Sequence, residues 1–436
     1  MSDSSVRTRK LPHVVVIGGG FAGMRLVKSL PPDEVQVTLI DRENHHLFQP
    51  LLYQVATAGL SAVDVAQPIR AVFGARPNFS VLMAEVTGFD LASRKVIHSR
   101  GSLEYDWLVV AAGGMTTYFG HPEWEKFAPG LKCLDDALRI RRKILCSFEQ
   151  AETEPDPKRC EELMTVVVVG GGPTGVELAG NFAELARTVL NKDFDHIDPT
   201  KARVVLINAG PRVLETFTPE LSASAQRQLE KLGVEVRTNW RVEAIRENEV
   251  AVAGQTIRAA NIIWAAGVSA VPLGKMLGAP VDRAGRVLVQ PDLSVPGHPE
   301  VFAVGDIASL VDANGVMVPG VAQGALQMGE HAAKTILHEV RVARDAAEPH
   351  PRKPFAYFDK GSMATIGRSA AVAQIRKLEL SGTLAWLAWL VVHLMFLVGF
   401  RNKISVLMQW IYSYFTYKRG ARVITGTTGE KSAGSA

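Results

Sequence analysis

The sequence predicts an α/β protein with two parallel-sheet domains and a helical C-terminal region. Three observations support this fold class. Two runs of β-branched residues each continue into a Gly-x-Gly-x-x-Gly turn and a helical stretch, a later apolar strand ends in Gly-Asp, and an apolar, basic, aromatic segment follows it. At 436 residues the chain is long enough for two or three domains.

The first glycine-rich turn follows a buried strand expected at Val14–Ile17. Its glycines permit a tight turn, close approach of the backbone to a pyrophosphate and close packing of helix on strand, while the helix N-terminus favours an anion. The next strand ends in an acid, at the spacing that suits a pair of ribose hydroxyls. We therefore predict a dinucleotide site formed by Gly18, Gly19, Gly20, Phe21, Ala22, Gly23, Asp41 and Arg42.

The second glycine-rich turn lies in Met164–Gly180, directly after four valines. Its cradle contains Gly170, Gly172, Pro173 and Gly175. Two complete fingerprints predict two Rossmann-like dinucleotide-binding domains, and most simply FAD at one cradle and a nicotinamide coenzyme at the other.

The second cradle departs from the usual pattern at Asn208, which ends the strand where NADH enzymes usually place a carboxylate. A carboxylate would bind the 2′- and 3′-hydroxyls of the ribose and repel a 2′-phosphate. Asn208 keeps the hydrogen-bonding capacity without the repulsion, and Arg212 follows closely in sequence. We expect NADH as the donor, with NADPH also possible.

Two further buried strands are expected within Tyr105–Gly114 and Ile262–Val268. Both run into small residues, among them Ala112 and Gly267, which we place beside a cofactor.

The segment Val301–Ala308 is a strand that ends in Gly305 and Asp306. Because it follows the second nucleotide domain, the chain returns here to complete the first domain, which is therefore split in sequence. Asp306 suits a contact to the ribityl chain of a flavin, and the alternative is a helix cap or turn residue.

These features predict four stretches of chain. Residues 11–125 and 271–342 form the two parts of the FAD-binding domain, and residues 126–270 form the NAD(P)H-binding domain. Residues 343–436 form a C-terminal region that begins with a polar link at Ala343–Phe355 and ends in a tail expected to be disordered.

Charge and cysteine content narrow the function classes. The net charge of +4 is too small to predict a nucleic-acid partner. Cys133, Cys146 and Cys160 form no CxxC or close pair, so we expect a reducing compartment and no dithiol redox centre. The polar, basic N-terminus lacks the apolar stretch of a secretory signal.

The C-terminal region contains an uncharged run, Leu380–Phe400, followed by an apolar stripe at helical spacing that includes Ile404, Ile411 and Phe415. No Asp or Glu occurs from Leu380 to Gly429, and basic residues bracket the stripe. This pattern favours helices lying in an anionic lipid interface, over residues 380–422. A membrane span, a buried hairpin and a dimer contact remain alternatives.

The sequence resembles the type II NADH:quinone oxidoreductases, within the glutathione-reductase-like flavoproteins with two dinucleotide-binding domains. The resemblance rests on "HHLFQPLLYQVATAGLS", "GGGPTGVELAG", "VFAVGDIA" and "AQGALQ", and covers the chain from about His13 to Arg422. It implies that the first cradle, with Thr57, Ala112, Gly305, Asp306 and Ala322, holds FAD, and that Gly170, Gly172, Gly175 and Asn208 hold NADH.

Three further residues receive a catalytic role from the resemblance. Glu177, placed in the first turn after the second cradle, would lie near nicotinamide and flavin, although a carboxylate favoured by the helix dipole is an equal alternative. Gln323 and Gln327 lie four residues apart and would meet a quinone headgroup, with Gly324 and Ala325 leaving room for a flat ring. Two amides facing water are the alternative.

The expected activity is hydride transfer from NADH to FAD, then two-electron transfer to a membrane quinone without proton pumping. No protein nucleophile or metal is needed, because the cofactor carries the chemistry. We expect a peripheral, monotopic homodimer on the cytoplasmic face of the cell membrane. The alternatives are a soluble NAD(P)H-dependent flavin reductase serving a ferredoxin-like protein or oxygen, and a nicotinamide-sensing flavoprotein.

Overall fold

A computed structural model describes residues 11–191, 193–416 and 419–424. As far as described, they form two compact units: Met1–His46, Gln67–Met115 and Val268–Lys360 make the first, and Leu47–Ala66, Thr116–Gly267 and Gly361–Ala436 the second. The domain boundaries expected from the sequence stay predictions. One stretch expected in the FAD-binding part, Leu47–Ala66, groups with the second unit. The expected disordered tail, 425–436, lies outside the described residues.

The first unit is built on a mostly parallel sheet with the strand order β20-β21-β9-β1-β2-β5. Val14 pairs with Val37 on one side and Trp107 on the other, and Val301 pairs with Leu108. The strand from the late part of the chain thus joins the N-terminal sheet, which confirms the split domain. The strands are β1 (His13–Ile17), β2 (Gln36–Asp41), β5 (Phe79–Met83), β9 (Trp107–Val110), β20 (Ser294–Val295) and β21 (His298–Ala303).

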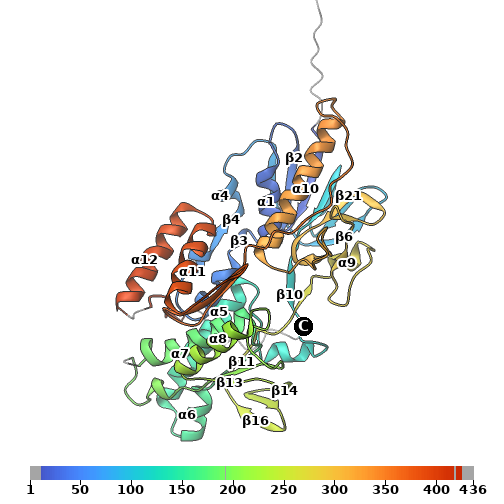
Figure 1. Cartoon of the computed structure of the whole chain (residues 1–436). Coiled ribbons are helices and arrows are strands. Elements are labelled where there is room, and N and C mark those ends of the chain that lie inside the picture. The colour runs from blue at the N-terminus through green and yellow to red at the C-terminus, as the bar shows by residue number, and fades with distance from the viewer. Residues whose placement is uncertain (1–10, 192, 417–418, 425–436) are drawn as a thin grey trace, which may run out of the picture. The chain divides into compact units, whose positions relative to one another are not determined.

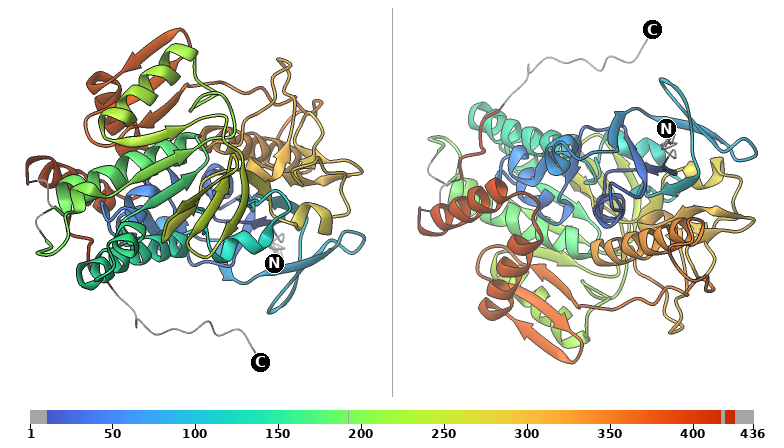
Figure 2. Two further views of the ribbon diagram at one scale, coloured as in Figure 1. Left: turned by 90° about the horizontal axis from the view of Figure 1, so that it is seen from below. Right: turned by 90° about the horizontal axis from the view of Figure 1, so that it is seen from above.

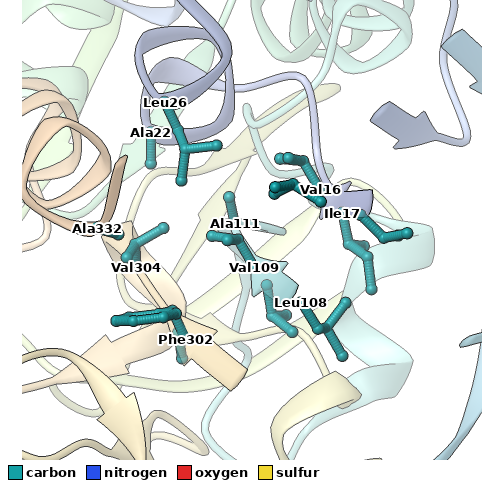
Figure 3. Close-up of a cluster of buried hydrophobic side chains, with 14 of the residues drawn as sticks. Val16, Ile17, Ala22, Leu26, Leu108, Val109, Ala111, Phe302, Val304 and Ala332 are labelled. Atoms are coloured by element: carbon teal, nitrogen blue, oxygen red, sulfur yellow. The ribbon is translucent and has the colours of Figure 1, made fainter. Parts of the chain in front are cut away.

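Two helices that are far apart in sequence cover this sheet, α1 (Phe21–Ser29) and α10 (Ala322–Val342). They lie side by side (Figure 1). An added Cβ on Gly329 of α10 would lie 2.3 Å from the carbonyl oxygen of Ala22 in α1, so the two backbones cross in close contact. Beneath them, fully buried aliphatic and aromatic side chains fill the core, including Val109 and Phe302 (Figure 3).

The first unit also contains short elements around the sheet. An antiparallel sheet has the order β6-β7-β8, and β19 pairs in parallel with β22. The elements are α4 (Ile69–Phe73), β6 (Val86–Asp90), β7 (Lys95–His98), β8 (Gly101–Glu104), β18 (Val268–Ala270), α9 (Leu273–Met276), β19 (Val287–Leu288), η5 (Gly305–Ile307) and β22 (Ala308–Ser309). Where the chain passes between units stand β3 (His45–Leu47), β4 (Ala66–Pro68) and β10 (Gly114–Thr116).

The second unit contains a parallel sheet with the order β13-β12-β11-β17. Val167 pairs with Val205 and Ile262. Each of the strands β11, β12 and β17 has four residues, and all of them are buried. The strands are β11 (Val166–Val169), β12 (Val204–Ile207), β13 (Val234–Arg237) and β17 (Asn261–Trp264). An antiparallel sheet follows in the order β14-β15-β16, formed by β14 (Val242–Arg246), β15 (Glu249–Val252) and β16 (Gln255–Arg258).

Helices of the second unit include the one that follows the second glycine-rich turn. They are η1 (Gln49–Leu51), α2 (Leu52–Ala56), α3 (Ala62–Val65), η2 (Pro122–Lys126), α5 (Leu134–Thr153), α6 (Pro157–Leu163), α7 (Pro173–Glu184), η3 (Leu185–Val189), η4 (Pro199–Lys201) and α8 (Pro219–Lys231).

The C-terminal region is only partly helical, which corrects the expectation of helices alone. An antiparallel sheet precedes the helices, formed by β23 (Ser362–Thr365), β24 (Ala371–Ile375) and β25 (Leu378–Ser381). Two helices follow, α11 (Thr383–Phe396) and α12 (Phe400–Thr416), red in Figures 1 and 2. Within the described residues, no helix combines the length and apolarity needed to cross a bilayer.

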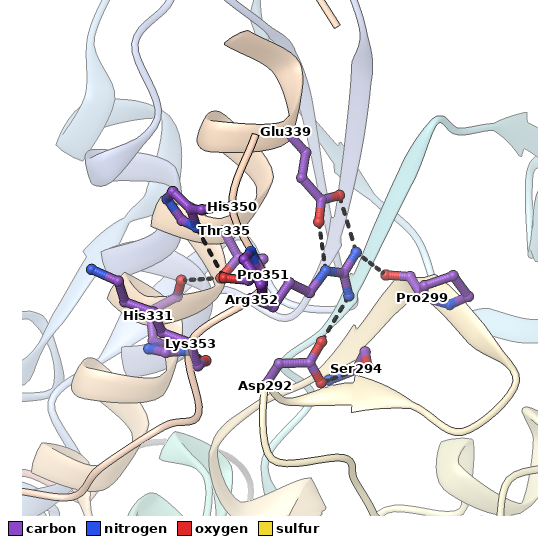
Figure 4. A network of polar contacts seen from close by, with 10 residues as sticks. All are labelled: Asp292, Ser294, Pro299, His331, Thr335, Glu339, His350, Pro351, Arg352 and Lys353. Carbon is purple, nitrogen blue, oxygen red and sulfur yellow. Dashed lines mark hydrogen bonds and ion pairs between the residues drawn. The ribbon is translucent and has the colours of Figure 1, made fainter. Parts of the chain in front are cut away.

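Within the first unit, Arg352 anchors the polar link Ala343–Phe355 (Figure 4). Its guanidinium donates to both carboxylate oxygens of Glu339 at 2.5 and 3.0 Å, to Asp292 Oδ2 at 2.8 Å and to the carbonyl of Pro299 at 2.9 Å. Both ion pairs are largely shielded from water. The link therefore lacks helix and strand but has a defined path.

Candidate active site

The first glycine-rich turn forms an open cradle between β1 and α1. Gly18 has a φ of +105°, and an added Cβ would lie 2.4 Å from the carbonyl oxygen of Ala111. An added Cβ on Gly23 would lie 2.0 Å from the Gly18 carbonyl oxygen, so neither position accepts a side chain. At Gly20, by contrast, an added Cβ would meet no atom within 4 Å, and no side chain caps α1. The N-terminus of α1 therefore faces open space of the kind a pyrophosphate fills.

Asp41 closes this turn from the end of β2. Its Oδ2 accepts the backbone N–H of Gly19 at 2.5 Å, and its Oδ1 accepts that of Glu43 at 2.8 Å. Asp41 is half-buried, while Arg42 beside it is exposed. The acid predicted for ribose binding therefore lies at the turn itself.

His46 binds the same turn through the carbonyl of Gly19, and this role was missed from the sequence. Its buried ring donates through Nδ1 to the carbonyl of Gly19 at 2.8 Å and packs edge-on against Phe21 at 5.3 Å between centroids. Burial lowers the pKa of His46 below its ordinary value, although the bond to Gly19 opposes the shift. The ring is therefore neutral at pH 7 and acts as a fixed donor.

Asp306 lies next to glycines at the other predicted flavin-contacting position of the first unit. An added Cβ on Gly114 would lie 3.6 Å from Asp306 Cβ, and one on Gly320 would lie 3.6 Å from Asp306 Oδ1. Gly305 has a φ of +78°, and its N–H lies 3.2 Å from Met328 Sδ. No side chain from Gly114 or Gly320 screens this carboxylate. Ala112 follows β9, and Ala322 is the first residue of α10.

Thr57 and Gly267 belong to the second unit. The Thr57 hydroxyl donates to the carbonyl of Tyr53 at 2.9 Å, and the Thr57 carbonyl accepts from Arg419 Nη1 at 2.8 Å. Gly267 has a φ of +79°, and an added Cβ would lie 2.5 Å from the ring of Phe119.

The second glycine-rich turn has the same arrangement of glycines as the first. Gly170 has a φ of +114°, and an added Cβ would lie 2.7 Å from the backbone of Ala265. An added Cβ on Gly175 would lie 1.8 Å from the Gly170 carbonyl oxygen, and one on Gly172 would meet nothing within 4 Å. Pro173 begins α7, whose N-terminus likewise lacks a side-chain cap. This cradle is also open to an anion.

Asn208 occupies in the second cradle the place that Asp41 occupies in the first. Its Oδ1 accepts the N–H of Gly171 at 3.0 Å. Its Nδ2 donates to the carbonyl of Arg212 at 2.9 Å and to Glu215 Oε1 at 3.3 Å. Arg212 in turn donates through Nη2 to the carbonyls of Glu215 and Phe217 at 2.9 and 3.3 Å.

Glu177 is a buried carboxyl group in the second turn of α7. The expectation of a first-turn residue was wrong, because α7 has no acid in its first turn, and the helix-dipole alternative falls with it. Glu177 is 8% exposed, and its Oε1 accepts the N–H of Thr365 at 3.5 Å. Burial raises the pKa of Glu177 well above its ordinary value, against the opposing effect of the Thr365 N–H. The carboxyl group therefore holds its proton more tightly than a solvent-exposed glutamate does.

A chain of hydrogen bonds leads from this site to α12 within the second unit. Thr365 Oγ1 lies 3.0 Å from the hydroxyl of Tyr53, which accepts from Gln54 Nε2 at 3.0 Å. Gln54 Oε1 accepts the indole N–H of Trp410 at 2.8 Å. The residues around Glu177 are thereby connected to the C-terminal helix.

Gln323 and Gln327 share one face of α10, as their spacing predicts, and both amides bind backbone. Gln327 Nε2 donates to the carbonyl of Phe358 at 3.0 Å, and its Oε1 accepts the Phe358 N–H at 2.9 Å. Gln323 Oε1 accepts the N–H of Lys360 at 3.2 Å. The glutamines are half-buried and fix the segment that leads toward β23.

The small residues between the glutamines do not leave the expected room for a ring. Gly324 and Ala325 are buried, and an added Cβ on Gly324 would lie 2.9 Å from the carbonyl oxygen of Pro319. Both residues lie on the side of α10 that packs against the protein interior. The expectation that these two positions accommodate a flat ring was wrong.

Comparisons with known proteins agree with two cradles in one chain. The model of the pyridine nucleotide-disulphide oxidoreductase family matches residues 12–329, and that of the NDH2 C-terminal domain matches residues 360–418. The chain is 47% identical over 426 residues to the type II NADH:quinone oxidoreductase Ndh of Mycobacterium tuberculosis, covering 95% of this chain and 90% of that protein. The chain belongs to the type II NADH:quinone oxidoreductase family.

Solved structures share the fold of this family member. NDH2 from Plasmodium falciparum in complex with NADH superimposes with a TM-score of 0.86 at 21% identity, covering 96% of this chain and 100% of that one. The sulfide:quinone oxidoreductase from Aquifex aeolicus has a TM-score of 0.69 at 19% identity, covering 93% and 95%. The predicted family and fold class are confirmed.

Two residues of the type II enzyme's cradles escaped the sequence analysis. His46 stands in the quoted "HHLFQP" segment, but nothing in that pattern indicates which histidine meets the glycine turn. Glu215 is the first acid after Asn208, seven residues on. A search for a replacement acid downstream of the missing one could have found Glu215.

Proposed function

We propose that this chain transfers a hydride from NADH to FAD and two electrons onward to a membrane quinone, without proton pumping. The observation that carries the proposal is the repeated open cradle, one in each unit, in a member of this family. When bound, FAD would accept the hydride and return the electrons to the second substrate. The chain's own residues would bind and orient the two dinucleotides and the quinone, and would supply a proton.

The first cradle fits the pyrophosphate of FAD, because Gly20 leaves open space at an uncapped helix N-terminus. Asp41 would bind the adenosine ribose, and Asp306, beside two glycines, would bind the ribityl chain. Thr57, Ala112, Gly305 and Ala322 would line the rest, as would Gly267. The second cradle fits NADH in the same way, through Gly170, Gly172, Gly175 and Asn208.

Glu177 suits the role of a proton store. Reduction of a quinone by NADH takes up one proton beyond the hydride, and a buried carboxyl group with a raised pKa can hold that proton at Oε. Its link to Tyr53 through Thr365 would orient it.

Gln323 and Gln327 would shape the quinone site by positioning. Each amide pairs with the backbone between Phe358 and Lys360, so the glutamines determine where that segment runs. A neutral amide can also bond a quinone carbonyl without a charge penalty. We therefore keep both residues in the proposed quinone site.

The membrane surface is proposed from the polarity of α12, which is the reverse of a water-soluble helix. Three of its polar residues face inward, and two of them, Ser405 through Oγ and Gln409 through Nε2, donate to Asp64 at 2.8 and 2.7 Å. Asn402, 5% exposed, donates to the carbonyl of Val63 at 3.2 Å. The exposed apolar side chains of α11 and α12 are Leu384, Leu387, Val391, Met395, Phe396, Phe400, Ile404, Leu407, Met408, Ile411 and Phe415.

This apolar face suits the lipid interface, and Arg401 and Lys403 beside it suit anionic headgroups. We place the protein on the cytoplasmic face because its unpaired cysteines suit a reducing compartment. The proposal includes a homodimer, which detergent-solubilised protein would reveal by light scattering.

Anaerobic half-reactions test the proposed chemistry. NADH should bleach the absorbance of bound FAD, and a ubiquinone or menaquinone analogue should restore it. If quinone leaves the flavin reduced while a ferredoxin-like protein or oxygen restores it, the soluble flavin reductase is the better assignment.

The same half-reactions test the glutamines. Replacing Gln323 and Gln327 with Ala should slow reoxidation by quinone about tenfold or more and leave reduction by NADH nearly unchanged. Gln150→Ala, at an exposed position on α5, is the control. Equal losses in both half-reactions would refute the quinone-site role.

Vesicle flotation tests the membrane surface. Wild-type protein should float with anionic liposomes, and Ile411→Glu with Phe415→Glu, 43% and 77% exposed, should leave it in the bottom fraction. Ile97→Glu, at a similarly exposed strand position, should still float. Wild-type protein that stays at the bottom and forms a dimer sensitive to the α12 changes would assign this face to a second copy.

A further inference from the structure

The acid missing from the end of β12 is supplied from the loop that follows it. Asn208 ends the strand, and its amide nitrogen donates to Glu215 Oε1 at 3.3 Å. Asn208 and Glu215 together therefore present at the second cradle the kind of group that Asp41 alone presents at the first: an oxygen for the turn's N–H, and a negative charge.

The loop has a backbone path that delivers Glu215 to this position. Leu214 has a φ of +51°, uncommon for a residue with a side chain, and its N–H donates to the carbonyl of Gly171 at 2.7 Å. The Phe217 N–H donates to the Leu214 carbonyl at 2.9 Å and closes the turn. Glu215 is therefore held one residue away from the glycine-rich turn.

Gly210 provides the space for the carboxylate. Its φ is not positive, so the backbone does not require glycine there. An added Cβ would lie 1.5 Å from Glu215 Oε1 and 2.6 Å from its Cδ. Glycine at 210 is thus explained by the side chain that occupies the site.

The arginines near this loop either bind other groups or are exposed to solvent. Arg212 donates to two backbone carbonyls, as described above. Arg237 pairs with Glu235 at 3.1 Å and lies over the ring of Trp240 at 5.4 Å. Arg241, in the turn after β13, is exposed.

We propose that Glu215 selects NADH against NADPH in this chain. Its carboxylate lies beside the amide of Asn208, the residue proposed to bind the adenosine ribose. There it accepts hydrogen bonds from the ribose hydroxyls and repels a 2′-phosphate of charge about −2. The residual freedom to use NADPH expected from Asn208 is thereby removed. The inference rests on the proposed use of the second cradle for the nicotinamide coenzyme.

Binding of the oxidised coenzymes tests this without turnover. Calorimetry on the FAD-loaded protein should give a Kd for NADP⁺ well above that for NAD⁺. Glu215→Gln should lower the Kd for NADP⁺ about tenfold and change the Kd for NAD⁺ by about threefold or less. Gly210→Ala, which displaces the carboxylate, should shift the ratio in the same direction. Glu220→Gln removes an exposed carboxylate at the start of α8 and should leave the ratio unchanged.

Two results would overturn the assignment: wild-type affinities for NAD⁺ and NADP⁺ within about twofold of each other, or an equal effect of Glu220→Gln and Glu215→Gln. A parallel half-reaction separates this outcome from failure of the proposed function. If NADH does not bleach the flavin of the wild type, the function fails whatever the Kd ratio. If it does and the ratio is unaffected by Glu215, only the selection by Glu215 fails.

Discussion

Glu177 is a carboxyl group with almost no water around it and one long backbone donor, the N–H of Thr365. Such a group costs little when neutral and much when ionised, so its pKa rises. The sequence placed this acid after the second cradle, but spacing alone could not reveal its burial. That depends on β23, which lies far along the chain and covers α7. The glycines of the cradles were predictable because their role needs only local backbone.

Glu177→Gln should raise the melting temperature relative to wild type at pH 8 and change it little at pH 5. The native state holds the Glu177 proton more tightly than the unfolded chain, so wild-type stability is full below the ordinary value of 4.5. It falls as the pH rises toward the raised pKa, by up to about 1.4 kcal/mol per pH unit, whereas glutamine does not titrate. Thermal unfolding at both pH values measures this, with Glu220→Gln as the control. A difference independent of pH would contradict it.

At the scale of an element, α12 shows what periodicity can and cannot establish. The sequence identified the apolar stripe correctly, because residues at helical spacing share a face. Whether that face points inward depends on its neighbours, and here the inward face meets Asp64, 341 residues before Ser405. The strands β23–β25 were missed for a related reason. Their segment is rich in Ala and Ser and has no long β-branched run, so pairing along the sheet forms the element.

Asp64→Ala should loosen α12 and lower the free energy of unfolding by about 1–3 kcal/mol. Asp64 is 5% exposed, and without it Ser405 and Gln409 lose a buried acceptor. Hydrogen exchange over 400–416 should accelerate, while Ser413→Ala on the same helix should leave it unchanged. Unaltered exchange in Asp64→Ala would show that apolar packing alone holds α12.

At the scale of the whole molecule, each unit is assembled from stretches far apart in sequence. The return of β21 to the first sheet was predictable. A strand that ends in Gly-Asp after a complete nucleotide-binding domain is expected to join the sheet of the split domain. The membership of Leu47–Ala66 in the second unit was not. Its short helices pack against α5 and α7, which the local pattern does not encode.

Gly329→Ala tests how such distant stretches depend on each other. The added methyl would lie 2.3 Å from the Ala22 carbonyl oxygen, so α1 and α10 must separate, at a cost of about 1–3 kcal/mol. Because α1 opens from the first cradle, the variant should also retain less FAD. Flavin absorbance relative to protein and the melting temperature measure both effects. Gly88→Ala, whose nearest contact would be 3.6 Å, is the matched control, and equal behaviour of the two would contradict this account.

The exposed apolar side chains of α11 and α12 also have a consequence for fluorescence. Trp386, Trp389 and Trp410 all lie on these helices, out of the seven tryptophans of the chain. Trp389 is buried against His393, and Trp386 stacks on Tyr414. The helix pair therefore carries its own fluorophores, and brominated acyl chains should quench them on docking. Trp107, Trp124, Trp240 and Trp264 remain as an unquenched internal reference, so docking can be followed without a label.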